Sequence, residues 1–175
     1  SVTDNNANNN SAYGFTAMDA ITTGDYNTVM GYGGGSALTT GEQNVVMGAF
    51  ALGSAVTSAQ NVAIGYAAMG NADGGEAKNV AVGYNALNEL NSTADNYNVA
   101  VGFEAGKKVS TGLYNILTGG LAGDALTTGT GNIAIGHEAL STEDAHGRNV
   151  AIGYDALAAQ NAGADAYNVA IGYSA

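Results

Sequence analysis

The side chains best suited to chemistry are few in this chain. His137 and His146 are the only histidines, and they lie nine residues apart. Cysteine is absent, which excludes a thiolate nucleophile, a thiolate metal site and a disulfide framework. Neither a Gly-x-Ser-x-Gly motif nor a phosphate-binding P-loop motif occurs. The sequence therefore predicts a protein that is not an enzyme.

Two pairs of acidic residues offer oxygen ligands of the kind that Ca²⁺ prefers. Asp73 lies close to Glu76, and Glu143 is followed directly by Asp144. No EF-hand loop and no glycine-rich calcium-binding repeat surrounds either pair. We interpret these residues as solvated loop charges and predict no cofactor, with Ca²⁺ as the alternative.

Aromatic side chains recur at one position of a regular pattern, directly after a glycine. In register along a stacked fold they would form a ladder, whose rings could stack on the sugar faces of a glycan. The interpretation that we prefer is that like rings pack on one another and stabilise the fold. The position is occupied by Phe15, Tyr32, Tyr66, Tyr84, Phe103, His137, Tyr154 and Tyr173. A second set, interpreted as packing beside a turn, is Tyr26, Tyr97, Tyr114 and Tyr167.

Threonine pairs also recur, as at Thr22-Thr23, Thr39-Thr40 and Thr127-Thr128. A flat, regular threonine array is typical of an ice-binding solenoid, so ice is an alternative ligand. The array is interrupted, for example at Thr57-Ser58 and at Glu143-Asp144. Turn formation is therefore the preferred interpretation of these residues.

All these spacings follow from a tandem repeat that spans the chain. Ten copies begin at Asn10, Asn27, Asn44, Asn61, Asn79, Asn98, Asn115, Asn132, Asn149 and Asn168, at spacings of 17 to 19 residues. We expect one repeat domain over 1–175, with 1–9 as an N-terminal lead-in. Glycine occupies the fifth position of every copy and permits a sharp corner. We interpret Asn61, Asn79, Asn132 and Asn149, with Gly65, Gly83, Gly136 and Gly153, as parts of a structural ladder.

The first residues of each copy alternate as a β-strand does. The second and fourth positions are usually aliphatic, so we expect Val62 and Ile64 to enter the core and Ala63 to face the other way. The third-position alanines would then form a smooth face for another chain, or a surface under a loop: Ala63, Ala81, Ala100, Ala134, Ala151 and Ala170. A second short strand is expected after the corner, and the extra residues of the longer copies fall in one loop edge.

One copy cannot bury enough apolar surface to offset the entropy of ordering its backbone, so the copies must stack. The predicted fold is therefore all-β, a tandem-repeat parallel β-solenoid of ten coils. At ~4.8 Å per coil, the coils would form a rod on the order of 50 Å long.

The charge balance limits the classes of partner. The net charge is −11, and only Lys78, Lys107, Lys108 and Arg148 are basic. No basic stripe for nucleic acid can be built from these four residues. No apolar run is long enough to span a bilayer, so we expect no direct membrane insertion.

The repeated Asn-Val-Ala-Ile-Gly, followed two residues on by Ala, resembles the head repeat of YadA-type trimeric autotransporter adhesins. Similar repeats occur in tail-fibre proteins of tailed phages. The resemblance implies a left-handed parallel β-roll in which three chains form a homotrimeric rod. It also implies an extracellular location, on a virion or on a bacterial cell surface. The repeat is longer here than the adhesin repeat, and we expect neither the coiled-coil stalk nor the membrane anchor of an autotransporter within these 175 residues.

From these observations we expect a non-enzymatic fibre or adhesin segment that serves as a rigid spacer and attachment element. Its partners would be two further copies of itself, other fibre or virion proteins at the ends, and a host receptor or glycan. The alternative is a ligand-binding solenoid that recognises glycan or ice through its tyrosine or threonine face.

Overall fold

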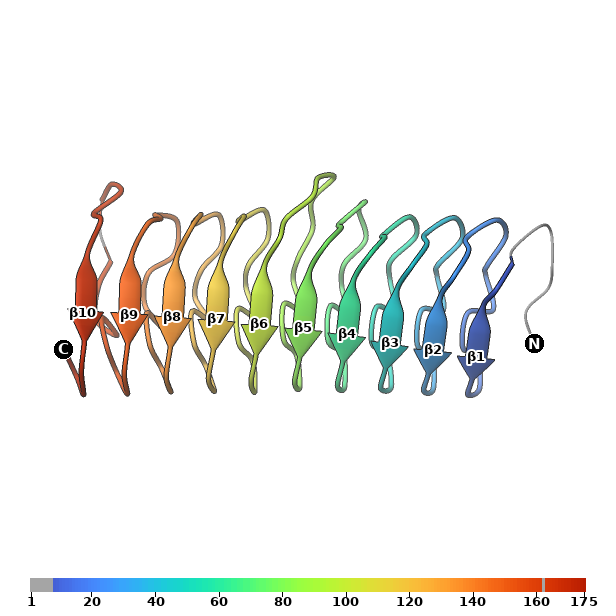
Figure 1. Ribbon diagram of the computed structural model, residues 1–175, viewed down its shortest axis with the longest axis horizontal. Helices are drawn as coiled ribbons and strands as arrows, with labels where there is room; N and C mark the ends of the chain where they lie inside the picture. The colour runs from blue at the N-terminus through green and yellow to red at the C-terminus, as the bar shows by residue number, and fades with distance from the viewer. Residues whose placement is uncertain (1–7, 162) are drawn as a thin grey trace.

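The computed structural model describes residues 8–161 and 163–175, so that most of the predicted lead-in lies outside the described residues. One parallel sheet contains ten strands in chain order, and each strand belongs to one coil of a β-solenoid (Figure 1). The strands are β1 (Ser11–Tyr13), β2 (Thr28–Met30), β3 (Val45–Met47), β4 (Val62–Ile64), β5 (Val80–Val82), β6 (Val99–Val101), β7 (Ile116–Thr118), β8 (Ile133–Ile135), β9 (Val150–Ile152) and β10 (Val169–Ile171).

The strand register follows the sequence repeat. Each strand begins one residue after the asparagine that opens its copy, and each residue pairs with the same position of the next copy. Val62 pairs with Val80 although the two copies differ in length from their neighbours. The extra residues loop out where the chain returns to the strand, and these loops protrude along one side of the solenoid (Figure 1). The predicted parallel β-solenoid is therefore confirmed.

The second strand expected in each coil was wrong. After the corner glycine the described chain forms a run of turns, and only the isolated bridges Ala59↔Ala77 and Ala77↔Asp95 lie outside the named strands. Left-handed residues alternate with ordinary ones in these turns, as at Ala67 and Met69, both with φ of 50°. Each such residue curls the backbone, which prevents an extended strand. Hydrogen bonds still join the coils, from Ala67 N to Ala49 O and from Met69 N to Ala86 O.

The corner requires glycine for two reasons. Gly65 has φ of 129°, which L side chains rarely adopt. A Cβ at Gly65 would also lie 2.4 Å from the carbonyl oxygen of Gly83 in the next coil. The coils therefore approach each other closely where the chain leaves the strand.

The expected direction of the strand side chains was also wrong. Ala63 is completely buried inside the coil, whereas Val62 and Ile64 lie on the outer face and are partly exposed. The same holds for the buried alanines Ala81, Ala100, Ala134 and Ala151, while Ala170 of the last strand is only partly buried. The coil is too thin for a large residue at the third position when the opposite wall contributes leucine or methionine. The alanine row therefore belongs to the core and is not a face for another chain.

Volumes in this thin core compensate across each coil. Where the strand contributes Ala134, the opposite turn contributes the buried Leu140. Where the strand contributes the larger Leu117, the turn has Gly123, whose Cβ would lie 2.7 Å from Leu117 Cδ2. Interiors pack at crystal-like density, so the large Leu117 requires glycine opposite it, whereas the smaller Val46 is accommodated together with Leu52.

The described residues contain no helix, so none of them could form an apolar helix that crosses a membrane.

Replacing Leu117 with Ala should lower the free energy of unfolding by about 2–5 kcal/mol, because the facing Gly123 cannot fill the cavity. Urea denaturation monitored by circular dichroism measures the loss. The matched control is Leu113→Ala, at a partly exposed loop position outside the core cluster, which should cost clearly less. Equal losses in the two variants would contradict the assigned core.

Candidate functional site

A ladder of buried asparagines runs along the solenoid. Asn115 illustrates its geometry: its backbone N and its Nδ2 donate to Asn98 Oδ1 at 2.9 and 3.1 Å, and its Nδ2 also donates to Gly129 O at 2.8 Å. The amide thus joins the coil before it to the last turn of its own copy. Asn61, Asn79, Asn132 and Asn149 lie in the same ladder and are completely buried. Such buried polar groups are stable only when their partners are all in place.

The aromatic side chains form a second ladder, on the outside of the corner. Six rings follow one another without a break, in the order Phe15, Tyr32, Phe50, Tyr66, Tyr84 and Phe103. Three more follow after an interruption, in the order His137, Tyr154 and Tyr173. Most neighbours are stacked, with centroids 5.2–5.7 Å apart and planes within 11°.

Phe50 was missed by the sequence analysis because it lies one position later than the other rings of its ladder. The expected position holds Ala49, and the ring of Phe50 reaches back to contact Tyr32 and Tyr66 edge-to-face at 5.2 and 5.9 Å. The signal available in the sequence was an aromatic residue directly after the position at which the aromatic residue is missing. The seventh coil has glycine, Gly120, at the aromatic position, and there the ladder stops.

Stacking decides what the ladder can bind. Because each ring inside a stack lies against a ring on both sides, its faces are covered and its edge faces water. Sugars and planar ligands stack on ring faces. Open faces remain where a stack ends, as at Phe103 and His137 beside the interruption and at the rings at the two ends of the solenoid, and face-to-face stacking is also broken at Phe50, whose contacts are edge-to-face.

Two of the four tyrosines of the second set take part in a repeated three-residue arrangement. Lys78 pairs with Asp95 and lies over the Tyr97 ring, with Nζ 5.1 Å from the centroid. Arg148 pairs with Asp165 and lies over the Tyr167 ring, with Cζ 5.5 Å from the centroid. Tyr114 stacks on Tyr97 at 5.4 Å, and Tyr26 is exposed. Both arrangements fasten the loops of the 19-residue copies to the preceding coil.

The first acidic pair is not brought together as a cation site. Glu76 is completely buried and its carboxylate accepts hydrogen bonds from Ser58 Oγ at 2.7 Å, Ser92 N at 2.9 Å and Gly74 N at 3.0 Å. Asp73 is exposed in the loop. The Glu76 carboxylate is thus fully used in holding two loops together.

The second acidic pair joins a histidine. Glu143 is completely buried and lies 3.1 Å from His146 Nδ1, while Gln160 Nε2 donates to it at 3.3 Å. With the exposed Asp144, these residues bring three ligand atoms within 4.8 Å of one another. They could donate to a divalent cation, although Glu143 already accepts hydrogen bonds from its neighbours.

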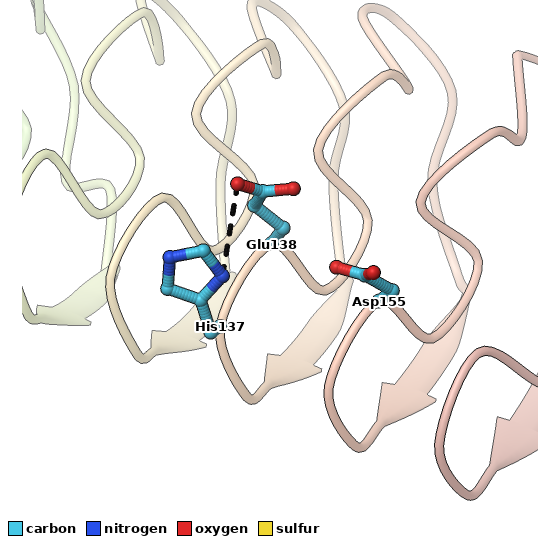
Figure 2. A group of neighbouring side chains, drawn as sticks. All are labelled: His137, Glu138 and Asp155. Atoms are coloured by element: carbon cyan, nitrogen blue, oxygen red, sulfur yellow. Dashed lines mark ion pairs between the residues drawn. The ribbon is translucent and has the colours of Figure 1, made fainter.

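A second group of this kind contains His137, Glu138 and Asp155, again with ligand atoms within 4.8 Å (Figure 2). His137 Nδ1 lies 3.7 Å from a Glu138 oxygen. Glu138 and Asp155 occupy the same position of successive coils, so their carboxylates are neighbours. Asp155, and to a lesser extent Glu138, raise the pKa of Tyr154 above its usual value. The sequence pointed to His137 but not to the two carboxylates, although the repeat alignment places both at the seventh position of successive copies.

Threonine hydroxyls are directed to the backbone. Thr22, Thr39 and Thr127 each donate to a carbonyl oxygen of the next coil, at 3.1, 3.1 and 2.7 Å. Each of these hydroxyls joins two coils through the hydrogen bond that it donates.

The fold and the ladders define a parallel β-solenoid with an aromatic surface ladder. The chain matches no protein family, and comparisons with curated proteins and with solved structures found no match.

Replacing Asn115 with Ala should lower the free energy of unfolding by roughly 2–5 kcal/mol, because it leaves the Asn132 N–H and the Gly129 carbonyl without partners in the interior. Chemical denaturation measures the effect. Asn91→Ala, on an exposed loop, is the matched control and should change stability little. A ladder variant as stable as the control would show that the amides are dispensable.

Replacing Asp124 with Asn should stabilise the protein at neutral pH. Burial raises the pKa of Asp124 above its usual 3.8, and its Oδ1 has no hydrogen-bond partner among the described residues. Ionising this carboxyl is therefore harder in the folded state, and the wild type loses stability as the pH rises from 3.8 through the folded pKa. The variant escapes this loss, so its advantage should be present at pH 7 and absent near pH 3. Denaturation at both pH values tests it, with the exposed Asp73→Asn as the control.

Proposed function

We propose that this protein is a non-enzymatic fibre segment that works as a homotrimeric rod on a virion or a bacterial cell surface. It acts as a rigid spacer and attachment element, with other fibre or virion proteins at its ends and a host receptor or glycan as its target. The repeat supports this placement through its resemblance to adhesin heads and phage tail fibres.

The observation that carries the proposal is the outer face of the sheet. Valine, isoleucine and methionine side chains point outward from nearly every strand, and several are about 40% exposed: Met30, Val45, Met47, Val101, Ile116 and Ile135. They form two adjacent rows that run along the ten-stranded sheet. Contiguous apolar surface on this scale marks an interface with another protein. Three copies that turned these faces toward a common axis would remove all of them from water.

The ladders support the role of a rigid spacer. Every coil is joined to its neighbours by strand pairing and by the buried amides, and aromatic stacks add to these contacts on both sides of the seventh coil. Solenoid stability is a sum of contacts between neighbouring repeats, so bending the rod would break all three sets of contacts together. The net charge of −11 keeps such an edge-rich surface soluble.

The wild-type protein should have a mass near three times 17.3 kDa in solution, as measured by light scattering. Replacing Ile135 with Lys should shift it to the mass of a single chain, because three buried ammonium groups would repel one another across the axis. Asn91→Lys adds the same charge to an exposed loop away from the sheet, and it should leave the trimer intact. A monomeric wild type would refute the trimer, and so would an Ile135→Lys variant that keeps the trimer mass.

A further inference from the structure

The aromatic ladder is interrupted between Phe103 and His137. Phe103 stacks on Tyr84 at 5.3 Å, and His137 stacks on Tyr154 at 5.2 Å, but no ring contact joins Phe103 to His137 in the described part of the chain. Because one ring is missing, the two faces are separated by roughly twice the coil spacing, about 10 Å. A planar group placed midway between the two faces would lie about as far from each ring as neighbouring rings of the ladder lie from one another.

The interruption leaves space. A Cβ at Gly120 would meet only His137 Cδ2, at an ordinary contact distance of 3.4 Å. Phe103 is 55% exposed, whereas the ladder rings that have a ring on both sides are 43–51% exposed. The additional exposure is that expected of a ring with one open face. We call this feature the Gly120 gap, lined by Phe103, Gly120 and His137.

The charges around the Gly120 gap favour a cation. Glu104 and Glu138 lie on the coils before and after Gly120, directly beside the two rings, and Asp124 belongs to the same coil as Gly120. Lys107 Nζ forms an ion pair with one oxygen of Glu104 at 3.0 Å, and the positive charge of Lys108 favours the ionised form of Asp124. Glu138 has no lysine or arginine partner within ion-pair distance in the described structure; His137 lies 3.7 Å from it, and its other charged neighbour is the Asp155 carboxylate. Glu138 is therefore the carboxylate best placed to meet an incoming cation.

The chain itself shows which cation suits a ring beside a carboxylate. Arg148 lies over the Tyr167 ring and pairs with Asp165, and Lys78 does the same with Tyr97 and Asp95. The Gly120 gap has the ring and the carboxylate but lacks the cation. Between two ring faces, a flat and delocalised group fits better than a tetrahedral ammonium.

We propose that the Gly120 gap binds a guanidinium group, as carried by an arginine side chain of a partner protein, between the faces of Phe103 and His137 and beside the Glu138 carboxylate. This inference uses residues of one chain only and does not require the trimer.

The test uses Nα-acetyl-arginine amide and its neutral citrulline counterpart, which keeps the flat shape without the charge. Saturation-transfer difference NMR on the full-length chain should show the arginine compound bound in the millimolar range and the citrulline compound bound at least fivefold more weakly. Equal signals from the two compounds would overturn the recognition of a cation.

Two variants locate the site. Gly120→Tyr places a ring in the gap without backbone strain and should abolish binding, whereas Gly163→Tyr, at a loop position with nothing within 4 Å, should not. Glu138→Gln should weaken binding threefold or more, while the exposed Glu42→Gln should have no effect. A circular-dichroism melt checks that Gly120→Tyr is folded. Binding that survives in folded Gly120→Tyr would overturn the assignment of the gap.

Discussion

The buried asparagine ladder is the constraint on which the rest of the structure depends. Each amide must accept from the asparagine of the next coil and donate to the carbonyl of a turn, and both partners must lie at fixed positions. An unpaired amide in this interior would cost more than the hydrogen bond is worth. Register is therefore fixed once per coil. Extra residues are tolerated only between one turn and the next asparagine, which places every longer loop along one side (Figure 1).

The close approach of the coils determines which side chains face inward. The corner glycines bring successive backbones so near that a Cβ could not fit, and the turns opposite the strand project leucine or methionine into the interior. Only a small residue fits beneath them, so alanine becomes the core residue of most strands. The large aliphatic side chains of the same strands must then face outward. The thin core and the apolar outer face are thus two consequences of one geometry, and the outer face is what a second copy would cover.

Sequence predicted the repeat, the parallel register and the asparagine and corner-glycine positions, because these residue types recur at fixed places. It could not show which side chains of each strand face the core, since the alternation at Val62, Ala63 and Ile64 fits either orientation of the strand. Nor could it predict the turns, because Ala67 and Met69 adopt left-handed conformations that their residue types do not favour. Tertiary contacts between coils impose these conformations. The carboxylates of Glu138 and Asp155 were not predicted to be neighbours because they lie far apart in the sequence, in successive copies of the repeat.

A regular solenoid has little capacity for recognition where its repeat is perfect. Stacked rings cover one another, threonine hydroxyls bond to carbonyls, and buried amides bond to their neighbours. Groups that could meet a ligand are left where a copy departs from the pattern. Gly120 removes one ring and uncovers two faces, and the longer loops bring a cation, a carboxylate and a tyrosine together. Specific binding on such a rod should therefore be encoded by its irregular positions, because the regular ones are occupied in holding the coils together.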